Sequence, residues 1–443
     1  EMQRSLVGSE MCIRDSSNAY VGCPLSQPSR AALWSGMMPH QTNVRSNSAE
    51  HINPPLPDSI PTLGSLFTAN GYEAVHFGKT HDMGSLRGFR HKEPVAKPFT
   101  DPEFPVNNDS FLDVGTCEDA VAYLSNPPQE PFICIADFQN PHNICGYVGE
   151  NKGEHIDSPI STPLPLLPEN FEVEDWEKLP LPIQYICCSH RRMMQAAHWN
   201  EDNYRHYVAA FQHYTRIVAR QIESVLEALY STPAGKNTIV IVLADHGDGM
   251  GSHRMVTKQV SFYEEMTNVP FIIAGPGIHP RQKPVEDLLT QPTIDLLPTL
   301  CELAGIPVPS SKPGISLAPF LKGEKQKRQH PYAASEWHSE YEVTVSPGRM
   351  IRSPRYKYTH YLEGNGEELY DMLKDKGERR NLAHDPKYSK ILAEHRALLD
   401  DYIRRTQDDY RSLKVEADKR WRSHAPGYPN HEGPCARDII NRK

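Results

Sequence analysis

The stretch TIVIVLADHGDGMGSH, residues 238–253, joins a short apolar run to a polar, glycine-rich turn. Residues 238–243 have the length and the β-branched composition of a buried strand. Ahead of them, apolar side chains recur at roughly helical spacing from Tyr204 to Leu229, which predicts a long amphipathic helix. We expect this helix and the strand to form one unit of an α/β sheet, joined by a right-handed crossover.

Further apolar runs of strand length lie outside this unit, at residues 73–77, 132–137 and 269–274. Helical patterns separate them, and a short helix is expected at residues 293–304. Strands that alternate with helices predict a parallel sheet that is covered on both faces. We therefore expect an α/β fold over residues 17–330, with a large mixed, mostly parallel sheet sandwiched by helices.

The pattern changes after the basic residues 322–328. Short alternating runs at residues 349–352 and 356–361 are followed by a helical pattern at about residues 387–405. These features predict a smaller C-terminal α+β subdomain at residues 331–443.

The opening residues 1–16, EMQRSLVGSEMCIRDS, have no clear hydrophobic period and resemble a translated sequencing adapter. We expect this segment to be non-native and leave it out of the fold. We also expect any signal peptide to have been lost from this sequence. Residues 151–182 are rich in proline and acidic side chains and lack a sustained period, so we expect a long loop there.

The composition excludes several classes of protein. The 47 basic and 56 acidic residues give a formal charge of −9, which argues against a nucleic-acid binder and requires any anion site to be local. No run of about 18 apolar residues is present, so we expect no membrane span. The nine cysteines are irregularly spaced and form neither a zinc pattern nor a dense disulfide framework.

Polar side chains follow three of the expected strands. Asp245 and His246 come directly after residues 238–243, Lys79 and His81 after residues 73–77, and His142 after residues 132–137. Ligands bind at the carboxyl ends of strands in open α/β sheets, and a carboxylate beside an imidazole suits a divalent cation. Each feature alone is also compatible with a glycine-rich turn or a structural histidine. Their recurrence favours an active site.

A second cluster, CPLSQPSRAALWSG, occupies residues 23–36. On composition alone it is a proline-containing loop in which Ser29 caps a helix. Together with the strand-end groups, however, it resembles the signature of the type I sulfatases of the alkaline phosphatase superfamily. That signature is Cys or Ser, any residue, Pro-Ser-Arg, and then Thr or Ser before Gly, and residues 26–30 and 35–36 match it.

The resemblance covers roughly residues 17–410, and its other elements keep the family's order: Gly78-Lys79-Thr80-His81, Pro141-His142, Asp245-His246-Gly247, Asp295-Leu296-Leu297-Pro298-Thr299 with Ala304-Gly305, and Glu368-Leu369-Tyr370-Asp371 with Asn381-Leu382. It implies an alkaline phosphatase-like fold and hydrolysis of sulfate esters. So many ordered matches make the resemblance specific.

The resemblance also implies a modified nucleophile. Ser26 looks like the position that is oxidised to formylglycine (3-oxoalanine), whose hydrated aldehyde supplies a nucleophilic hydroxyl. A serine here implies a radical-type sulfatase-maturating enzyme as a partner, unless Ser26 is an engineered replacement of cysteine. Cys23 lies too early for the signature and is interpreted as a bystander.

The remaining site residues take their roles from the same resemblance. Lys79 and Lys258 would supply positive charge to the sulfate oxygens, and Arg30 with Lys79 would orient the hydrated aldehyde. His142 would protonate the leaving oxygen and His81 would remove a proton so that sulfate is expelled, although the sequence leaves the order of the two histidines open. The resemblance also implies a calcium ion bound by Asp245, His246 and residue 26. Four further side chains are expected to contact substrate: His253, Arg254, Glu336 and His338.

One departure stands at the front of the sequence. The family takes two more metal ligands from an adjacent Asp pair after its first strand, and no such pair precedes Ser26. We therefore expect a central strand to be missing, with open strand edges. We also expect this chain to bind calcium poorly and to be inactive as given.

The expected substrate is a sulfated carbohydrate, with O- and N-sulfate both open, and the expected location is the periplasm or the outside of a bacterial cell. Pro141-His142 with Cys145-Gly146, and Glu336-Trp337-His338, resemble the N-sulfoglucosamine hydrolase branch. The alternatives are a phosphate or phosphonate monoester hydrolase of the same superfamily and a non-catalytic glycan-binding relative.

Overall fold

The computed structural model describes residues 13–15, 18–47, 54–100, 108–152, 163–172, 178–189, 191–258, 261–279, 288–324, 330–340 and 344–417. Residues 153–162 and 173–177 of the expected loop at residues 151–182 lie outside the described residues, as does the end of the C-terminal subdomain. Among the described helices, none is both long and apolar enough to cross a lipid bilayer.

The larger part of the molecule contains two three-stranded sheets. The first is parallel, in the order β3 (Arg90–Lys92), β2 (Glu73–Gly78) and β4 (Phe132–Asp137). In the second, the central strand β6 (Phe271–Ala274) pairs antiparallel with both β5 (Val240–Leu243) and β1 (Ile13–Asp15).

The expected strands are therefore present, and the α/β class is confirmed. The direction of β6 was not foreseen, because a fully apolar strand carries the same pattern whichever way it runs. The strand β1 lies inside the segment that the sequence reading left out of the fold.

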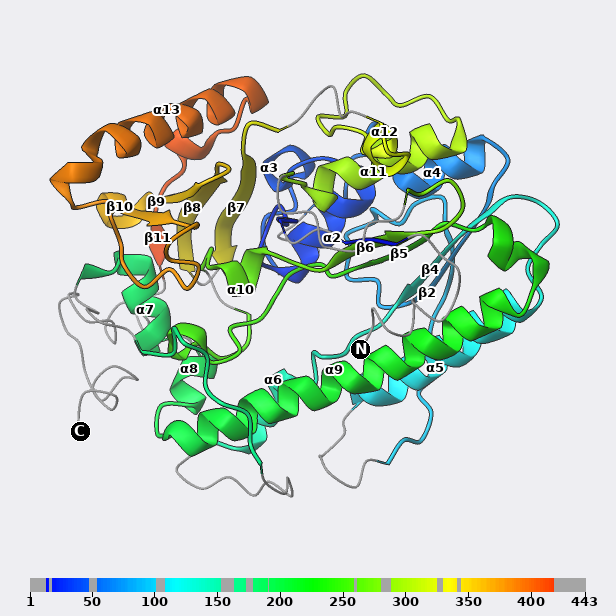
Figure 1. Ribbon diagram of the computed structural model, residues 1–443, viewed down its shortest axis with the longest axis horizontal. Coiled ribbons are helices and arrows are strands. Elements are labelled where there is room, and N and C mark those ends of the chain that lie inside the picture. The colour runs from blue at the N-terminus through cyan, green and yellow to red at the C-terminus, as the bar shows by residue number, and fades with distance from the viewer. Residues whose placement is uncertain are drawn as a thin grey trace.

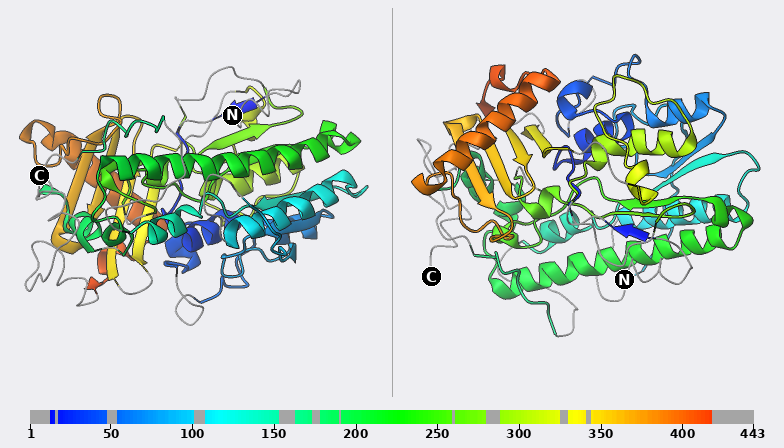
Figure 2. Two further views of the ribbon diagram at one scale, coloured as in Figure 1. Left: turned by 90° about the horizontal axis from the view of Figure 1, so that it is seen from below. Right: turned by 45° about the horizontal axis from the view of Figure 1, so that its top comes forward.

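Helices cover both faces of these sheets (Figure 1). One face carries α5 (Asn108–Ser125) and α9 (Glu201–Tyr230), which lie side by side (Figure 2). The other carries α2 (Ser26–Ser35), α4 (Leu63–Ala69), α11 (Pro292–Ala304) and α12 (Ala318–Leu321). Shorter helices complete this part of the chain: α3 (Pro39–Thr42), α6 (Ile144–Glu150), α7 (Leu181–Ser189), α8 (Arg191–Gln195) and α10 (Glu264–Thr267).

The long helix α9 is stabilised in two ways: hydrogen bonds cap its N-terminus, and one of its faces is apolar and buried. Asn200 accepts a hydrogen bond from the backbone of Asn203, and the Asn203 side chain in turn accepts one from the backbone of Asn200. Tyr207, Val208 and Leu226 are buried on the helix, and a short 3-10 helix (Pro233–Asn237) connects α9 to β5.

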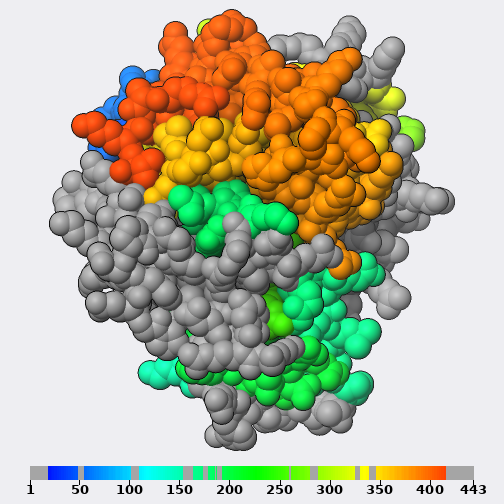
Figure 3. Space-filling view, turned by 90° about the vertical axis from the view of Figure 1, so that its left-hand side faces the viewer, coloured from blue at the N-terminus to red at the C-terminus, as the bar shows by residue number. Residues whose placement is uncertain are grey.

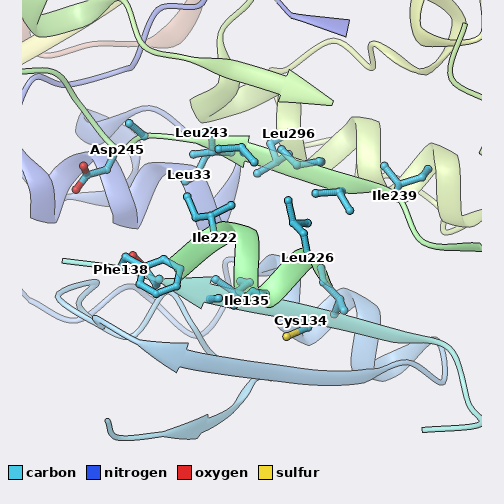
Figure 4. Close-up of a pocket in the computed structure, with 18 of the residues that line it drawn as sticks. Leu33, Cys134, Ile135, Phe138, Ile222, Leu226, Ile239, Leu243, Asp245 and Leu296 are labelled. Atoms are coloured by element: carbon cyan, nitrogen blue, oxygen red, sulfur yellow. The ribbon is translucent and has the colours of Figure 1, made fainter. Parts of the chain in front are cut away.

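A cavity of about 1750 Å³ separates the two sheets. The strands β4 and β5 are the end strands of their sheets and face each other across it, while α2 and α11 close one side and α9 the other (Figure 4). Both strands run toward the end of the cavity where Phe138 and Asp245 lie (Figure 4).

Among the described residues, no strand lies between β4 and β5, so the single large sheet expected from the sequence is divided in two. Apolar side chains line the cavity between the two sheets. They include Leu33, Cys134, Ile135, Ile222, Leu226, Ile239, Leu243 and Leu296.

The C-terminal subdomain is an antiparallel sheet covered by one helix. Its strands are β7 (Ala333–Glu340), β8 (Thr344–Arg352), β9 (Tyr356–Tyr361), β10 (Gly366–Asp371) and β11 (Glu416–Ala417), with β8 pairing β7, β9 and β11. The helix α13 (Ser389–Thr406) packs on this sheet through Leu392, Leu399 and Tyr402. Figure 3 shows α13 in orange over the strands in yellow. The prediction of a smaller α+β unit is confirmed.

A buried polar network joins this subdomain to the larger part. His40, at α3, lies with Nδ1 2.6 Å from Oε1 of Glu336 on β7, and Tyr402 donates to the same carboxylate. Arg349 binds the carboxylate of Asp408 through Nε at 2.7 Å and Nη2 at 2.9 Å. Since the side chains of both ion pairs are almost fully buried, their charges are satisfied by one another rather than by water.

Candidate active site

Ser26 is the first residue of α2 and is almost fully buried at the end of the cavity. Its Oγ lies 2.7 Å from Nε2 of His246, whose Nδ1 lies 2.8 Å from the carbonyl oxygen of Gly247. Because a carbonyl oxygen can only accept, Nδ1 of His246 carries the proton and Nε2 accepts from the Ser26 hydroxyl. The helix start places backbone N–H groups beside this hydroxyl, where negative charge is favoured.

Arg30 lies one helical turn beyond Ser26, on the same face of α2. Its Nε donates to Oδ2 of Asp245 at 2.9 Å, and its Nη1 donates to Asp137 at the end of β4. Burial by itself would raise the pKa of both carboxyls. The pKa of Asp137 is nevertheless held below its ordinary value by Arg30, and that of Asp245 by His246 and then Arg30. Arg30 thus joins the ends of the two facing strands.

Lys79 and Lys258 join Arg30 in a positively charged group that lines the cavity with Ser26, and His81 interacts with all three cations. Burial, followed by repulsion from Arg30, lowers the pKa of Lys79 to about 8. Burial and the charge of Lys79 lower the pKa of His81 to about 4. Three cations, Arg30, Lys79 and Lys258, therefore meet here in a chain of net charge −9, and they form a local site for an anion.

The structure brings most of the predicted catalytic residues to one cavity. Its lining includes Ser26, Arg30, Lys79, His142, Asp245, His246 and Lys258. His81 interacts electrostatically with Lys79, Arg30 and Lys258. The roles assigned to these residues stay predictions.

His142 follows β4 and is held by side chains of α5 that the sequence reading missed. Its Nδ1 lies 3.1 Å from Oδ2 of Asp109. One turn further along α5, the carboxylate of Asp113 accepts from the backbone N–H groups of Gln139 at 2.6 Å and Asn140 at 2.9 Å. The sequence shows only that Asp109 and Asp113 are four residues apart on an expected helix and so lie on one face of it. That spacing does not indicate which strand end the two carboxylates face.

The two residues after the glycine-rich turn make contacts of another kind. The His253 ring stacks on Tyr263 with 3.9 Å between centroids, and its backbone N–H donates to the Asn170 carbonyl. Arg254 donates to Glu172 at 2.7 Å and lies over the Phe171 ring. None of these partners belongs to the group around Ser26, so a substrate contact by either residue stays a prediction.

Glu336 and His338 lie on β7. Glu336 is buried and its carboxylate is bound by His40 and Tyr402, while its backbone N–H donates to the carbonyl of Gly22 at 2.8 Å. Glu336 therefore stabilises the loop before α2. The predicted contacts of Glu336 and His338 with substrate stay predictions. Cys23 in the same loop is buried, and burial raises its pKa, which makes the thiol a poor nucleophile.

The donors near Ser26 are too few for a complete calcium site. Calcium takes about six to eight oxygen ligands. Among the described residues, Asp245, His246 and the Ser26 hydroxyl converge, but Arg30 already holds Asp245 and Asp137. These residues do not fit calcium by themselves, so no catalytic step is assigned to a metal ion.

Comparisons with known proteins identify the family. The sulfatase family profile matches residues 16–306, and the profile of the N-sulphoglucosamine sulphohydrolase C-terminal region matches residues 251–405. The chain therefore belongs to the sulfatase family, and it is a sulfuric ester hydrolase.

Particular relatives are close in sequence. The chain is 79% identical over 427 residues to the Delta 4,5-hexuronate-2-O-sulfatase of Bacteroides thetaiotaomicron, with 96% of this chain and 89% of the relative covered. A solved structure of a 2-O GAG sulfatase superposes with a TM-score of 0.92 at 79% identity, covering 96% of this chain and 92% of that one. A phosphonate monoester hydrolase of Agrobacterium radiobacter shares the fold at 19% identity, with a TM-score of 0.67 and 90% of each chain covered.

Proposed function

We propose that this sulfatase removes the 2-O-sulfate from a Δ4,5-unsaturated hexuronate of a glycosaminoglycan fragment. The observation that carries the proposal is the 79% identity, over 96% of the chain, to a relative of that named activity. The three cations around Ser26 support it, because a sulfate ester and a hexuronate carboxylate are both anions. The choice between O- and N-sulfate, open in the sequence, is thereby made in favour of a 2-O-sulfate ester.

Ser26 is proposed as the position of the formylglycine. The side chain fits that role because it lies at a helix N-terminus, faces the cavity and is held by His246 at 2.7 Å. A hydrated formylglycine there would supply one hydroxyl to attack sulfur and a second one from which the aldehyde can re-form. The proposal requires a radical-type maturating enzyme, as a serine precursor implies.

The chain's own residues would act on the substrate as follows. Lys79 and Lys258 bind the sulfate oxygens and offset the charge that spreads over them in the transition state. His142 gives a proton to the sugar oxygen as the sulfur–oxygen bond breaks. His81 takes up a proton near residue 26 when sulfate leaves. Arg30 holds the end of α2 against β4 and β5 throughout.

Calcium at Asp245 and His246 remains a prediction from the family resemblance, and no step above is assigned to it. Turnover by this chain would overturn the expectation that it is inactive as given. We also propose a periplasmic or secreted location, because sulfated glycan polymers lie outside the cell.

The test is the release of inorganic sulfate from a panel of unsaturated disaccharides that carry a single sulfate at the 2-O, 6-O or N position. The protein is co-expressed with a radical-type maturating enzyme, and its Ser26→Ala variant is the blank. Release from the 2-O-sulfated disaccharide alone supports the proposal. Release from another isomer would reassign the position of the sulfate.

A second panel separates the other classes. Paired aryl sulfate and aryl phosphonate substrates distinguish a sulfatase from a phosphonate monoester hydrolase, which shares the fold. Binding of the 2-O-sulfated disaccharide without turnover, by a protein shown to contain formylglycine, would favour the glycan-binding alternative.

A further inference from the structure

Asp109 and His142 form a carboxylate–imidazole pair at the edge of the cavity. Asp109 lies in the first turn of α5 and His142 in the loop after β4, with Oδ2 and Nδ1 3.1 Å apart. His142 lines the cavity that contains Ser26, Lys79 and Lys258. The pair therefore connects the imidazole of His142 to α5, a helix that carries no residue assigned a catalytic role.

The loop that carries His142 is anchored independently of this pair. Asp113 accepts from two backbone N–H groups of the loop, and Ser110 Oγ accepts from the Asn140 side chain at 3.1 Å. Asn143 also donates to Ser110. Asp113 thus accepts two hydrogen bonds from the loop backbone, and Ser110 accepts two from the side chains of Asn140 and Asn143. Because these four hydrogen bonds hold the loop, the carboxylate of Asp109 is not needed to build it.

The contact fixes the tautomer of His142. The pKa of Asp109, which burial alone would raise, is held below its ordinary value by the hydrogen bond with His142 and by Lys79 and Lys258. An ionised carboxylate can only accept, so the proton of neutral His142 sits on Nδ1. Nε2 is then the ring atom free to exchange a proton with a molecule in the cavity.

We propose that Asp109 is a positioning residue for His142: it fixes the Nδ1–H tautomer and raises the affinity of Nε2 for a proton, which binds there when an anion occupies the cavity. This inference rests on the proposed function, since it assigns His142 as the acid of that reaction. Asp109 acts through His142 and does not itself contact the reacting atoms.

The charges that face His142 explain why the anion is needed. The hydrogen bond that His142 donates to Asp109 raises the pKa of His142, but burial and the charges of Lys258 and Lys79 outweigh it and lower the pKa to about 4. His142 is therefore neutral at pH 7 when the cavity is free of anions. A sulfate group bound by the two lysines cancels part of their repulsion, and Asp109 supplies the remaining favourable charge.

The first test is an NMR titration of His142 in the whole protein, using ¹⁵N- and ¹³C-labelled histidine, with the signals assigned by their loss in His142→Ala. Inorganic sulfate is the probe. In the unsubstituted protein the ring nitrogens should report the Nδ1–H tautomer, and sulfate should raise the pKa of His142. In Asp109→Asn the tautomer preference should weaken and the pKa should fall at every sulfate concentration.

Asp119→Asn is the matched control, because it removes a carboxylate from the same helix at a surface pair with Lys92. It should leave the His142 titration unchanged. A titration of Asp109→Asn identical to that of Asp119→Asn would overturn the inference. No turnover is needed for this measurement, so its failure is distinct from a failure of the proposed function.

The second test is a double-mutant cycle with the 2-O-sulfated disaccharide. Asp109→Asn should lower kcat about 10- to 100-fold with a smaller change in KM, and Asp109→Glu should recover part of the loss. In a His142→Ala background, Asp109→Asn should cost almost nothing further, because its effect passes through the imidazole. Additive losses would mean that Asp109 has only a structural role.

Discussion

The hydroxyl oxygen of Ser26 lies 2.7 Å from Nε2 of His246, and the other ring nitrogen of His246 donates to the carbonyl oxygen of Gly247. Burial, the largest influence, lowers the pKa of His246 to about 4, so the ring is neutral at pH 7 and accepts the Ser26 proton. This contact links the start of α2 to the turn after β5, two segments far apart in the sequence. The active site therefore forms only when the chain folds and brings these two segments together.

The charge of Lys79 should set the alkaline limit of activity. Its pKa of about 8 means that the ammonium group is present below that pH and is lost above it. We expect kcat/KM for the sulfated disaccharide to fall as the pH rises through about 8.

The variant Lys258→Met should move this limit to higher pH, because it removes a charge that lowers the pKa of Lys79. The overall rate should also fall about 100-fold with the loss of a sulfate-binding cation. Lys92→Met, at the surface pair with Asp119, is the control and should leave the profile unchanged. An alkaline limit that stays in place in Lys258→Met would contradict this assignment.

The buried pair Arg349–Asp408 should contribute strongly to stability. Both side chains are almost fully buried, so Asp408→Asn leaves an arginine charge without its carboxylate. We expect the free energy of unfolding to fall by about 3–5 kcal/mol. The exposed pair Arg411–Asp400 provides the comparison: Asp400→Asn should change it by less than about 1 kcal/mol. Denaturant unfolding measures both, and equal effects would argue against the network described here.

The cavity between β4 and β5 should bind apolar dyes. Open apolar surface of this size is unusual in a folded protein and favours association. We expect the chain to enhance the fluorescence of an anilinonaphthalene dye, and Ile222→Ser, which places a polar group in the cavity, to reduce it. Leu166→Ser changes a leucine that is 86% exposed elsewhere and is the control. If both variants reduce dye binding equally, the dye does not report on the cavity.

Calcium should bind weakly to this chain. The described donors at Asp245, His246 and Ser26 fall short of the oxygen ligands that the ion takes. Isothermal titration should give a Kd of about 1 mM or weaker, in the range of the weakest protein sites. Asp245→Asn should abolish whatever binding remains. A micromolar Kd would show that the donor set has been underestimated.

The sequence predicted the elements better than their arrangement. The strands at residues 132–137 and 356–361 were predicted to the residue, the first from an apolar run and the second from an alternating run. The direction of β6 and the division of the sheet were not predictable, because they depend on which strands pair rather than on any local pattern.

The same distinction applies to the site. Ser26, Lys79, His142 and Asp245 follow strands or begin a helix, so their place at one edge could be expected from the topology. Asp109 could not, because only the packing of α5 against the loop after β4 brings its carboxylate to His142.

The most direct test of the central claim is mass spectrometry of the peptide that contains Ser26, from protein co-expressed with a radical-type maturating enzyme. The account predicts a peptide about two mass units lighter than the serine form, because oxidation to the aldehyde removes two hydrogens. Unmodified Ser26, under conditions that convert a control sulfatase with a serine precursor, would contradict the assignment of Ser26 as the nucleophile.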